Sequence, residues 1–371
     1  MKIALLGPAH SIHTIRWANG LADRGVDTHV LSLTSQDDAY DPRVSLHRLP
    51  WGSPQGYLLA TPALRRALRK IGPDLLNTHY ATGYGTLARL AGFTPSLLSA
   101  WGSDIYAFPY KSGLHRRVLR GNLDRATAVA VTGQAMARQV RQFTDRPVHI
   151  TPFGIDTERF SPAPATTKTD DTRPIVIGTV KGLETTYGID ILLQAFSRLV
   201  STLAAEACAT ADRLTLKIYG SGSQAQALQA MATELGIADR THFLGHIPHS
   251  EVPAALRELD VYVALSRMDS FGVAILEACA CSIPVLVSDA DGPAEIVVDG
   301  VTGYVVPRLD ATAAAARLRQ LVADPELRRR LGEAGRAHVQ MHYSWRASLD
   351  SMLGAYQNTL RQYRDTQAGT P

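Results

Sequence analysis

The stretch SRMDSFGVAILEA, residues 266–278, does the most to decide the fold. Its pattern indicates a strand that ends at Asp269, a tight Ser-Phe-Gly turn, and a helix that carries Glu277 eight residues after the first acid. Ser270 is a residue type that commonly caps a helix N-terminus. The amides after it would then face the crevice at the carboxyl end of a parallel sheet. An anionic diphosphate finds hydrogen-bond donors and a partial positive charge at such a place.

Two series of alternating strands and helices surround this stretch, which predicts an α/β protein with two mainly parallel sheets. Strands are expected at 2–6, 28–33, 75–78, 96–100 and 128–131, and then at 175–178, 214–219, 242–244, 261–263 and 284–287. The segment 161–174, rich in Pro, Thr and Asp, has the composition of a linker. We therefore expect one Rossmann-like domain over 1–165, completed by a C-terminal helix at 345–371, and a second over 170–344.

Further motifs extend the pattern over the whole chain: PFGIDTERFSP at 152–162, DGPAEIV at 291–297 and DGVTGYVV at 299–306. With the two spaced acids, they make the chain resemble glycosyltransferase family 4, the retaining transferases of the GT-B fold. The family signature is Glu, seven residues, Glu, and Asp269 stands here in place of the first Glu. The resemblance implies two Rossmann-like domains that face each other across a cleft, with the C-terminal helix returning to the first. It also implies a nucleoside diphosphate sugar as donor.

The resemblance places the donor on the second domain. Asp269 would contact the donor sugar and Glu277 the ribose. Lys181 would replace the family's phosphate-binding Arg, whereas Tyr187 stands where a Lys is expected. The donor-binding residues implied are Lys181, Gly220, Asp269, Ser270, Phe271, Gly272, Val273 and Glu277.

The first domain is expected to bind the acceptor. The loop after its first strand carries His10 and His13, and His79 follows a later strand. Many relatives have a His near the reacting sugar at the position where this chain has Trp101, so that role does not carry over. Asp104, three residues later, is a candidate for acceptor contact, and Asp269, Lys181 and Asp104 make up the expected catalytic set.

Three other patterns have a structural reading. Residues 220–225, GSGSQA, fit a loose dinucleotide fingerprint but lack its acidic partner, so we interpret them as a tight strand-to-helix turn near the nucleotide. Asp289 and Asp291 resemble an Asp-x-Asp metal site without the context of one. The three cysteines form no disulfide framework or metal site. We expect no metal and no cofactor besides the donor.

Charge is unevenly distributed along the chain. Residues 1–160 hold 19 Lys and Arg against 11 Asp and Glu, a net +8, although the whole chain carries only +4. The basic residues gather at 65–70 and 111–125, which fits a solvated helix face or attraction to anionic lipid headgroups. No nucleic-acid motif accompanies them. No stretch has the length and apolarity of a membrane span or signal peptide, so we expect a cytoplasmic protein, either free or peripheral at the inner face of the membrane.

These observations favour a retaining transferase that moves a sugar to a glycan or lipid-linked acceptor, such as an envelope polysaccharide or lipopolysaccharide precursor. A soluble small-molecule acceptor and a GT-B-fold nucleotide-sugar epimerase are the alternatives. A non-catalytic nucleotide-sugar-binding protein is a third.

Overall fold

A computed structural model describes residues 1–35, 39–163 and 173–368, and the chain divides into two units. Unit 1 comprises Met1–Pro152 and Ser348–Pro371, and unit 2 comprises Phe153–Ala347. Most of the expected linker, and the expected domain boundary at 165–170, lies outside the described residues. Residues 153–163 group with unit 2.

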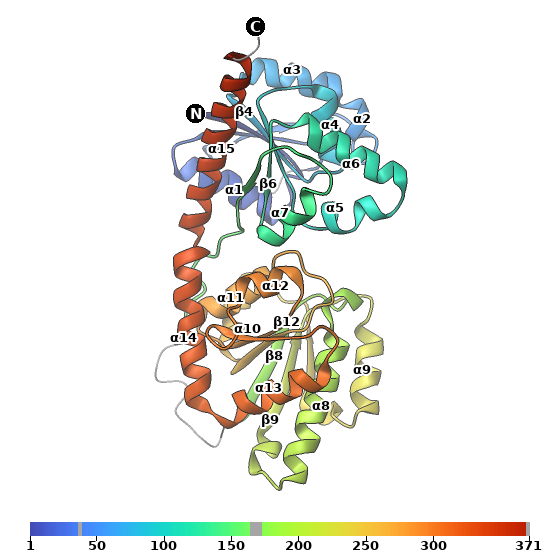
Figure 1. Ribbon diagram of the computed structural model, residues 1–371, viewed down its shortest axis with the longest axis vertical. Coiled ribbons are helices and arrows are strands. Elements are labelled where there is room, and N and C mark those ends of the chain that lie inside the picture. The colour runs from blue at the N-terminus through green and yellow to red at the C-terminus, as the bar shows by residue number, and fades with distance from the viewer. Residues whose placement is uncertain (36–38, 164–172, 369–371) are drawn as a thin grey trace. The chain divides into compact units, whose positions relative to one another are not determined.

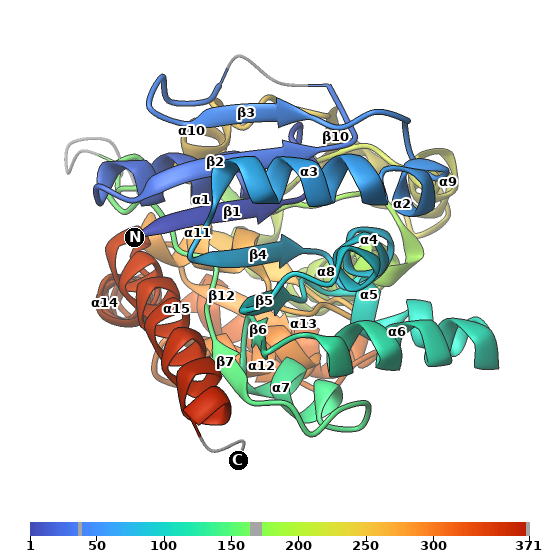
Figure 2. The ribbon, with the colours of Figure 1, turned by 90° about the horizontal axis from the view of Figure 1, so that it is seen from above.

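Unit 1 is built on a seven-stranded parallel sheet with the strand order β3-β2-β1-β4-β5-β6-β7. Figure 2 shows β3, β2, β1 and β4 in this order. Ile3 of the inner strand β1 is level with Thr28 of β2 and Leu75 of β4. Helices cover both faces of such a sheet, which explains why inner strands such as β1 and β6 are continuous apolar runs. The strands are β1 Lys2–Leu6, β2 Asp27–Ser32, β3 Ser45–Arg48, β4 Leu75–His79, β5 Ser96–Ser99, β6 Ala128–Val131 and β7 Val148–Ile150.

The helices of unit 1 enclose two apolar clusters against this sheet. One cluster joins β1, β2 and β4 to α3 and α4 through residues such as Leu6, Leu64 and Leu87. The other joins β5 and β6 to α5, α6 and α7. The helices are α1 Ile12–Asp23, α2 Gly56–Leu59, α3 Thr61–Ile71, α4 Gly83–Ala91, α5 Ser103–Tyr106, α6 Gly113–Arg125, α7 Gln134–Val140 and α15 Trp345–Ala368.

Helix α15 returns the chain to unit 1, as the resemblance implies, and Figure 1 shows it as the long red helix. The hydroxyl of the fully buried Tyr356 donates to Asn77 Oδ1 of β4 at 2.9 Å. Asn77 in turn donates to Leu97 O and Ser99 Oγ of β5. A buried polar chain therefore ties the last helix to the middle of the sheet.

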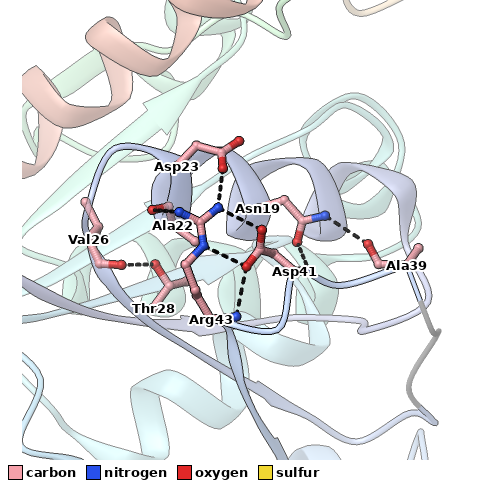
Figure 3. Close-up of polar contacts among 8 residues, drawn as sticks. All are labelled: Asn19, Ala22, Asp23, Val26, Thr28, Ala39, Asp41 and Arg43. Carbon is pink, nitrogen blue, oxygen red and sulfur yellow. Dashed lines mark hydrogen bonds and ion pairs between the residues drawn. The ribbon is translucent and has the colours of Figure 1, made fainter.

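Arg43 fastens the loop before β3 to the end of α1, as Figure 3 shows. Its guanidinium donates to both carboxyl oxygens of Asp41, to Asp23 and to the carbonyl of Ala22. These contacts hold the pKa of Asp41 at about 2, mainly through the hydrogen bond from the Arg43 side chain. Arg43 is exposed and Asp41 is half-buried, so these contacts order the surface loop rather than the core.

Unit 2 has a six-stranded parallel sheet with the order β10-β9-β8-β11-β12-β13. Strand β8 lies between β9 and β11, so the strand order reverses direction there. The strands are β8 Ile175–Val180, β9 Leu214–Tyr219, β10 Thr241–Gly245, β11 Val261–Ala264, β12 Val285–Ser288 and β13 Gly303–Val306.

The main core of unit 2 packs α8 and α13 on β8, β9 and β11, with Phe196, Leu318 and Val263 among the buried side chains. These two helices pack against each other over that face of the sheet (Figure 1). The helices are α8 Ile189–Ala205, α9 Ala225–Glu234, α10 Val252–Arg257, α11 Val273–Ala280, α12 Asp291–Ile296, α13 Ala311–Ala323 and α14 Pro325–His342.

Every strand expected from the sequence is present, and the predicted α/β class with two parallel sheets is confirmed. The sequence missed β3, β7 and β13. β3 and β7 are short edge strands of half-buried or exposed residues and so lack an apolar run. Within the described residues, no helix has both the length and the apolarity to cross a membrane.

Candidate functional site

A cavity of about 300 Å³ opens in unit 2 where the carboxyl ends of β8, β9 and β10 meet the start of α11. Ligands of open parallel sheets bind at carboxyl ends beside the point where the strand order reverses, which here lies between β8 and β11. The cavity is lined by Val180, Lys181, Gly182, Tyr219, Gly220, Ser221, His246, Ile247, His249, Val252, Ala274 and Glu277.

Glycine shapes the floor of this cavity. Gly220 has φ +148°, and a Cβ there would lie 1.9 Å from the carbonyl oxygen of Lys181. Only glycine lets the turn after β9 approach the turn after β8 so closely. The predicted tight turn at 220–225 is confirmed, with α9 starting at Ala225.

Lys181 and Asp269 form an ion pair beside the cavity, although 88 residues separate them. Lys181 Nζ lies 2.7 Å from Asp269 Oδ2, and the two side chains are only 12% and 11% exposed. Burial alone would lower the pKa of Lys181, but the charge and hydrogen bond of Asp269, together with the nearby Tyr262 and Tyr187, outweigh burial and raise the pKa. The ammonium also lies 4.7 Å from the ring centre of Tyr187. Tyr187, which stands where the family has a Lys, thus contacts Lys181, which stands where the family has an Arg.

The loop between β11 and α11 differs from the sequence expectation. Strand β11 ends at Ala264, five residues before Asp269, and α11 starts at Val273. The helix is capped by Gly272, in a left-handed conformation at φ +96°, so the prediction that Ser270 is the N-cap is wrong. The N–H of Phe271 donates to Asp269 Oδ1, and its buried ring contacts Phe153 and Tyr343. The turn is longer than predicted because it anchors an aromatic side chain before the helix begins.

Glu277 lies in the second turn of α11, with a side chain only 6% exposed. Its Oε1 lies 3.0 Å from Nε2 of His249, which comes from the segment after β10. Because an ionised carboxylate can only accept, the imidazole must donate from Nε2 in this contact. Both residues of this polar pair line the cavity, whereas of the first pair only Lys181 does.

An ion pair between Arg267 and Asp190 restrains the loops next to the site. Nη1 and Nη2 of Arg267 donate to the Asp190 carboxylate, at 2.7 and 2.6 Å, and the backbone N–H of Arg267 donates to Thr186 O. This contact ties the loop after β11 to the turn that carries Tyr187. It restricts the positions available to Asp269 and Tyr187.

At the carboxyl edge of the unit 1 sheet, the candidate histidines differ in burial. His79 is the last residue of β4 and fully buried, with Nδ1 3.3 Å from Thr14 Oγ1. Burial lowers its pKa to about 3, and His13 adds to the shift. Its Nε2 meets no hydrogen-bond partner among the described residues. His10 is exposed, whereas His13 is half-buried, with its ring centre 5.5 Å from that of Trp101.

Asp104 is buried and accepts hydrogen bonds from three backbone N–H groups, those of Ala81, Trp101 and Gly102, at 2.8 to 3.3 Å. Burial raises the pKa of this carboxyl, and the three N–H groups oppose the rise. Both of its oxygens are engaged by the backbone. This geometry suits a residue that holds two loops together.

Other places in the chain fit a ligand less well. A larger hollow of about 740 Å³ lies between α8 and α13, but helix residues alone line it and no carboxyl-end loop reaches it. Among residues 1–35, 39–163 and 173–368, no group of three or more His, Cys, Asp or Glu side chains could hold a metal ion.

Sequence reasoning missed part of the cavity wall. The segment after β10 supplies His246, Ile247 and His249, and none of them was singled out. Their position was a usable signal, since β10 is an edge strand whose carboxyl end lies at the same side of the sheet as those of β8 and β9.

Comparison with known sequences identifies both halves of the chain. The family described as "Glycosyl transferases group 1" matches residues 165–338, and "Glycosyl transferase 4-like" matches residues 2–133. A GDP-mannose-dependent alpha-(1-6)-phosphatidylinositol monomannoside mannosyltransferase of Mycolicibacterium smegmatis is 31% identical over 71% of this chain and 70% of its own. A D-inositol 3-phosphate glycosyltransferase of Geodermatophilus obscurus is 32% identical over 59% of this chain, about half its own length (50%).

Solved structures share the fold. A sucrose-phosphate synthase from Thermosynechococcus elongatus superposes with a TM-score of 0.80 at 21% identity, over 96% of this chain and 98% of its own. An Anabaena protein in complex with UDP and glucose gives a TM-score of 0.78 at 19% identity, over 96% of this chain and 100% of its own.

Proposed function

We propose, from the premise that the chain belongs to the group 1, family 4-like glycosyl transferases, that it moves a sugar with retention of anomeric configuration to a lipid-linked glycan acceptor. The chain is a glycosyltransferase that uses a nucleotide sugar. The observation that supports the donor site is the cavity that brings Lys181 and Glu277 together at the carboxyl edge of the unit 2 sheet.

Each pair has a role in this proposal. Lys181 binds the diphosphate and neutralises the charge that grows on it as the sugar leaves. The first amides of α11 add a partial positive charge. Asp269 accepts hydrogen bonds from hydroxyls of the donor sugar, and Glu277 accepts them from the ribose.

In the reaction that we propose, the acceptor hydroxyl attacks from the face that the diphosphate leaves. The bond from the sugar carbon to the diphosphate oxygen breaks, and that oxygen takes the acceptor proton. Positioning and charge stabilisation supply the catalysis, and no covalent nucleophile is needed.

Donor binding can be tested by thermal unfolding with a panel of nucleoside diphosphate sugars, because a ligand of the folded state stabilises it by mass action. A concentration of 100 Kd raises the free energy of unfolding by about 2.7 kcal/mol. We expect one base and one sugar to give the largest shift, and Glu277→Ala to weaken binding of the bare nucleoside diphosphate by about 1.5–3 kcal/mol. Wild-type affinity in Glu277→Ala would contradict the placement of the ribose.

A membrane-bound acceptor is supported by the exposed basic residues of unit 1. Arg66, Arg69 and Lys70 are exposed on α3, and Arg116, Arg117 and Arg120 on α6. The mannosyltransferase relative acts on a phosphatidylinositol mannoside, as its name states. The inositol phosphate relative favours a soluble acceptor instead. We favour the lipid-linked acceptor because of the charge.

Liposome co-sedimentation separates these acceptors. We expect binding to anionic vesicles that falls as salt rises, and weaker binding after Arg66→Gln with Arg69→Gln. The matched control is Arg198→Gln with Arg330→Gln, which removes the same charge from exposed sites of unit 2. Equal binding to neutral and anionic vesicles would favour the soluble acceptor.

We also propose that transfer needs no metal, since Lys181 and the start of α11 can neutralise the diphosphate. Activity should then survive an excess of chelator. Complete loss that manganese restores would overturn this part of the proposal.

A further inference from the structure

We propose that His249 is a positioning residue that sets the Glu277 carboxylate for the ribose of the donor, and so makes the site discriminate ribose from deoxyribose. The inference rests on the proposed function, because it assumes that a nucleoside diphosphate sugar occupies the cavity. It adds a residue that neither the spacing of the two acids nor the match to the family assigns.

The contact itself is well defined. His249 Nε2 lies 3.0 Å from Glu277 Oε1, and Glu277 is 6% exposed while His249 is 42% exposed. Both residues line the cavity. A half-exposed imidazole is not needed to fill the core, so its polar contact is the reason for a His here.

The segment that carries His249 is itself held from two sides. The carbonyl oxygen of His249 accepts a hydrogen bond from the Arg159 guanidinium at 2.6 Å. Its ring centre lies 5.7 Å from that of Phe160. The donor nitrogen is therefore fixed before any ligand arrives, which lowers the entropic cost of using it.

The consequence concerns the free oxygen of Glu277. When Oε1 of Glu277 accepts a hydrogen bond from His249, the carboxylate can no longer rotate freely, and Oε2 points in one direction. A ribose hydroxyl that donates to Oε2 then meets an acceptor already in place. A deoxynucleotide leaves that buried oxygen without its partner, and such a loss is costly.

The test compares two probes, a nucleoside diphosphate and its 2′- or 3′-deoxy form, by calorimetry on the full chain. We expect wild type to bind the ribose form roughly 10- to 100-fold more tightly than the deoxy form that lacks the contacted hydroxyl. His249→Ala should reduce this ratio by about 3- to 30-fold, mostly by weakening the ribose form. His249→Gln keeps an N–H donor near the same place and should recover most of the ratio.

His242→Ala is the matched control, since His242 is an exposed His on β10 outside the cavity lining. It should leave the ratio at the wild-type value. In Glu277→Ala, the further change His249→Ala should have no effect on either probe. A wild-type ratio in His249→Ala, an equal loss for both probes, or no recovery in His249→Gln would overturn the proposal. Failure of the wild type to bind any nucleoside diphosphate would instead overturn the proposed function.

Discussion

The polar side chains at the carboxyl edges of the two sheets differ in the partners that they contact. In unit 1, Asp104 gives both oxygens to backbone N–H groups, and His79 is fully buried at the end of β4. In unit 2, Lys181 pairs with Asp269, and His249 with Glu277, next to an open cavity. The carboxylate of the first edge is satisfied by the backbone, whereas the charged groups of the second edge are satisfied by other side chains.

This difference has a chemical consequence. A backbone N–H cannot turn away without moving its loop, so a carboxylate that it binds stabilises the structure. A side-chain partner can turn away and exchange one charged contact for another, so the unit 2 pairs can accept a ligand. For the acceptor we therefore expect contacts from His10 and His13 rather than from His79 or Asp104.

The largest expected effect is at the Lys181–Asp269 pair. Lys181→Met removes the cation and leaves a nearly buried carboxylate without its partner, so the free energy of unfolding should fall by about 3–5 kcal/mol. Binding of a nucleoside diphosphate should be lost as well, because the phosphate loses its cation. Urea unfolding and calorimetry measure the two effects.

A double substitution separates stability from binding. Lys181→Met with Asp269→Leu replaces the pair by apolar groups, which is often neutral for stability. The double variant should regain most of the stability but none of the diphosphate affinity. Recovery of both would contradict the role of Lys181 as a phosphate ligand.

The next effect tests the structural role of Asp104. Asp104→Ala leaves the N–H groups of Ala81, Trp101 and Gly102 without their acceptor, which should cost about 3 kcal/mol of unfolding free energy. Asp104→Asn keeps one carbonyl oxygen and should cost less. If Asp104→Ala unfolds like wild type yet loses transfer, Asp104 contacts the acceptor as the sequence suggested.

The sequence predicted what depends on local pattern. Inner strands such as β1 and β6 are continuous apolar runs because both faces of the sheet are covered, so they could be recognised. The spaced acids and the glycine turn predicted the region of the cavity, which Gly220 and Glu277 line. The resemblance put Lys181 and Asp269 in one site, but their direct ion pair was not predicted. The contact of His249 with Glu277 was not predicted either, because nothing near Glu277 in the chain indicates His249. The cap of α11 was misplaced because Ser270 satisfies the local rule for a cap, whereas the packing of Phe271 delays the helix.

A smaller effect is expected where α15 joins the unit 1 sheet. Tyr356→Phe leaves Asn77 Oδ1 without its buried donor and should lower the free energy of unfolding by about 1–3 kcal/mol. Tyr363→Phe is the matched control, because the Tyr363 hydroxyl only accepts from Thr94 Oγ1 at 3.3 Å in a half-buried place. Equal losses of unfolding free energy in the two variants would show that the buried Tyr356–Asn77 hydrogen bond contributes no more than the half-buried one.

The smallest effect appears only in acid and concerns His79. Its folded-state pKa is about 3, below the value of about 6.5 expected in the unfolded chain. Between these values the unfolded chain binds a proton that the folded chain does not, so stability is complete above about pH 6.5 and is lost as the pH falls toward 3. Between pH 7.5 and 5.5 this one group should cost about 1.4 kcal/mol. His79→Leu should remove that part of the pH dependence when urea unfolding of both proteins is compared at the two pH values. An unchanged difference would mean that His79 takes up its proton in the folded state, and the first edge would then hold a charge open to a ligand, as the second edge does.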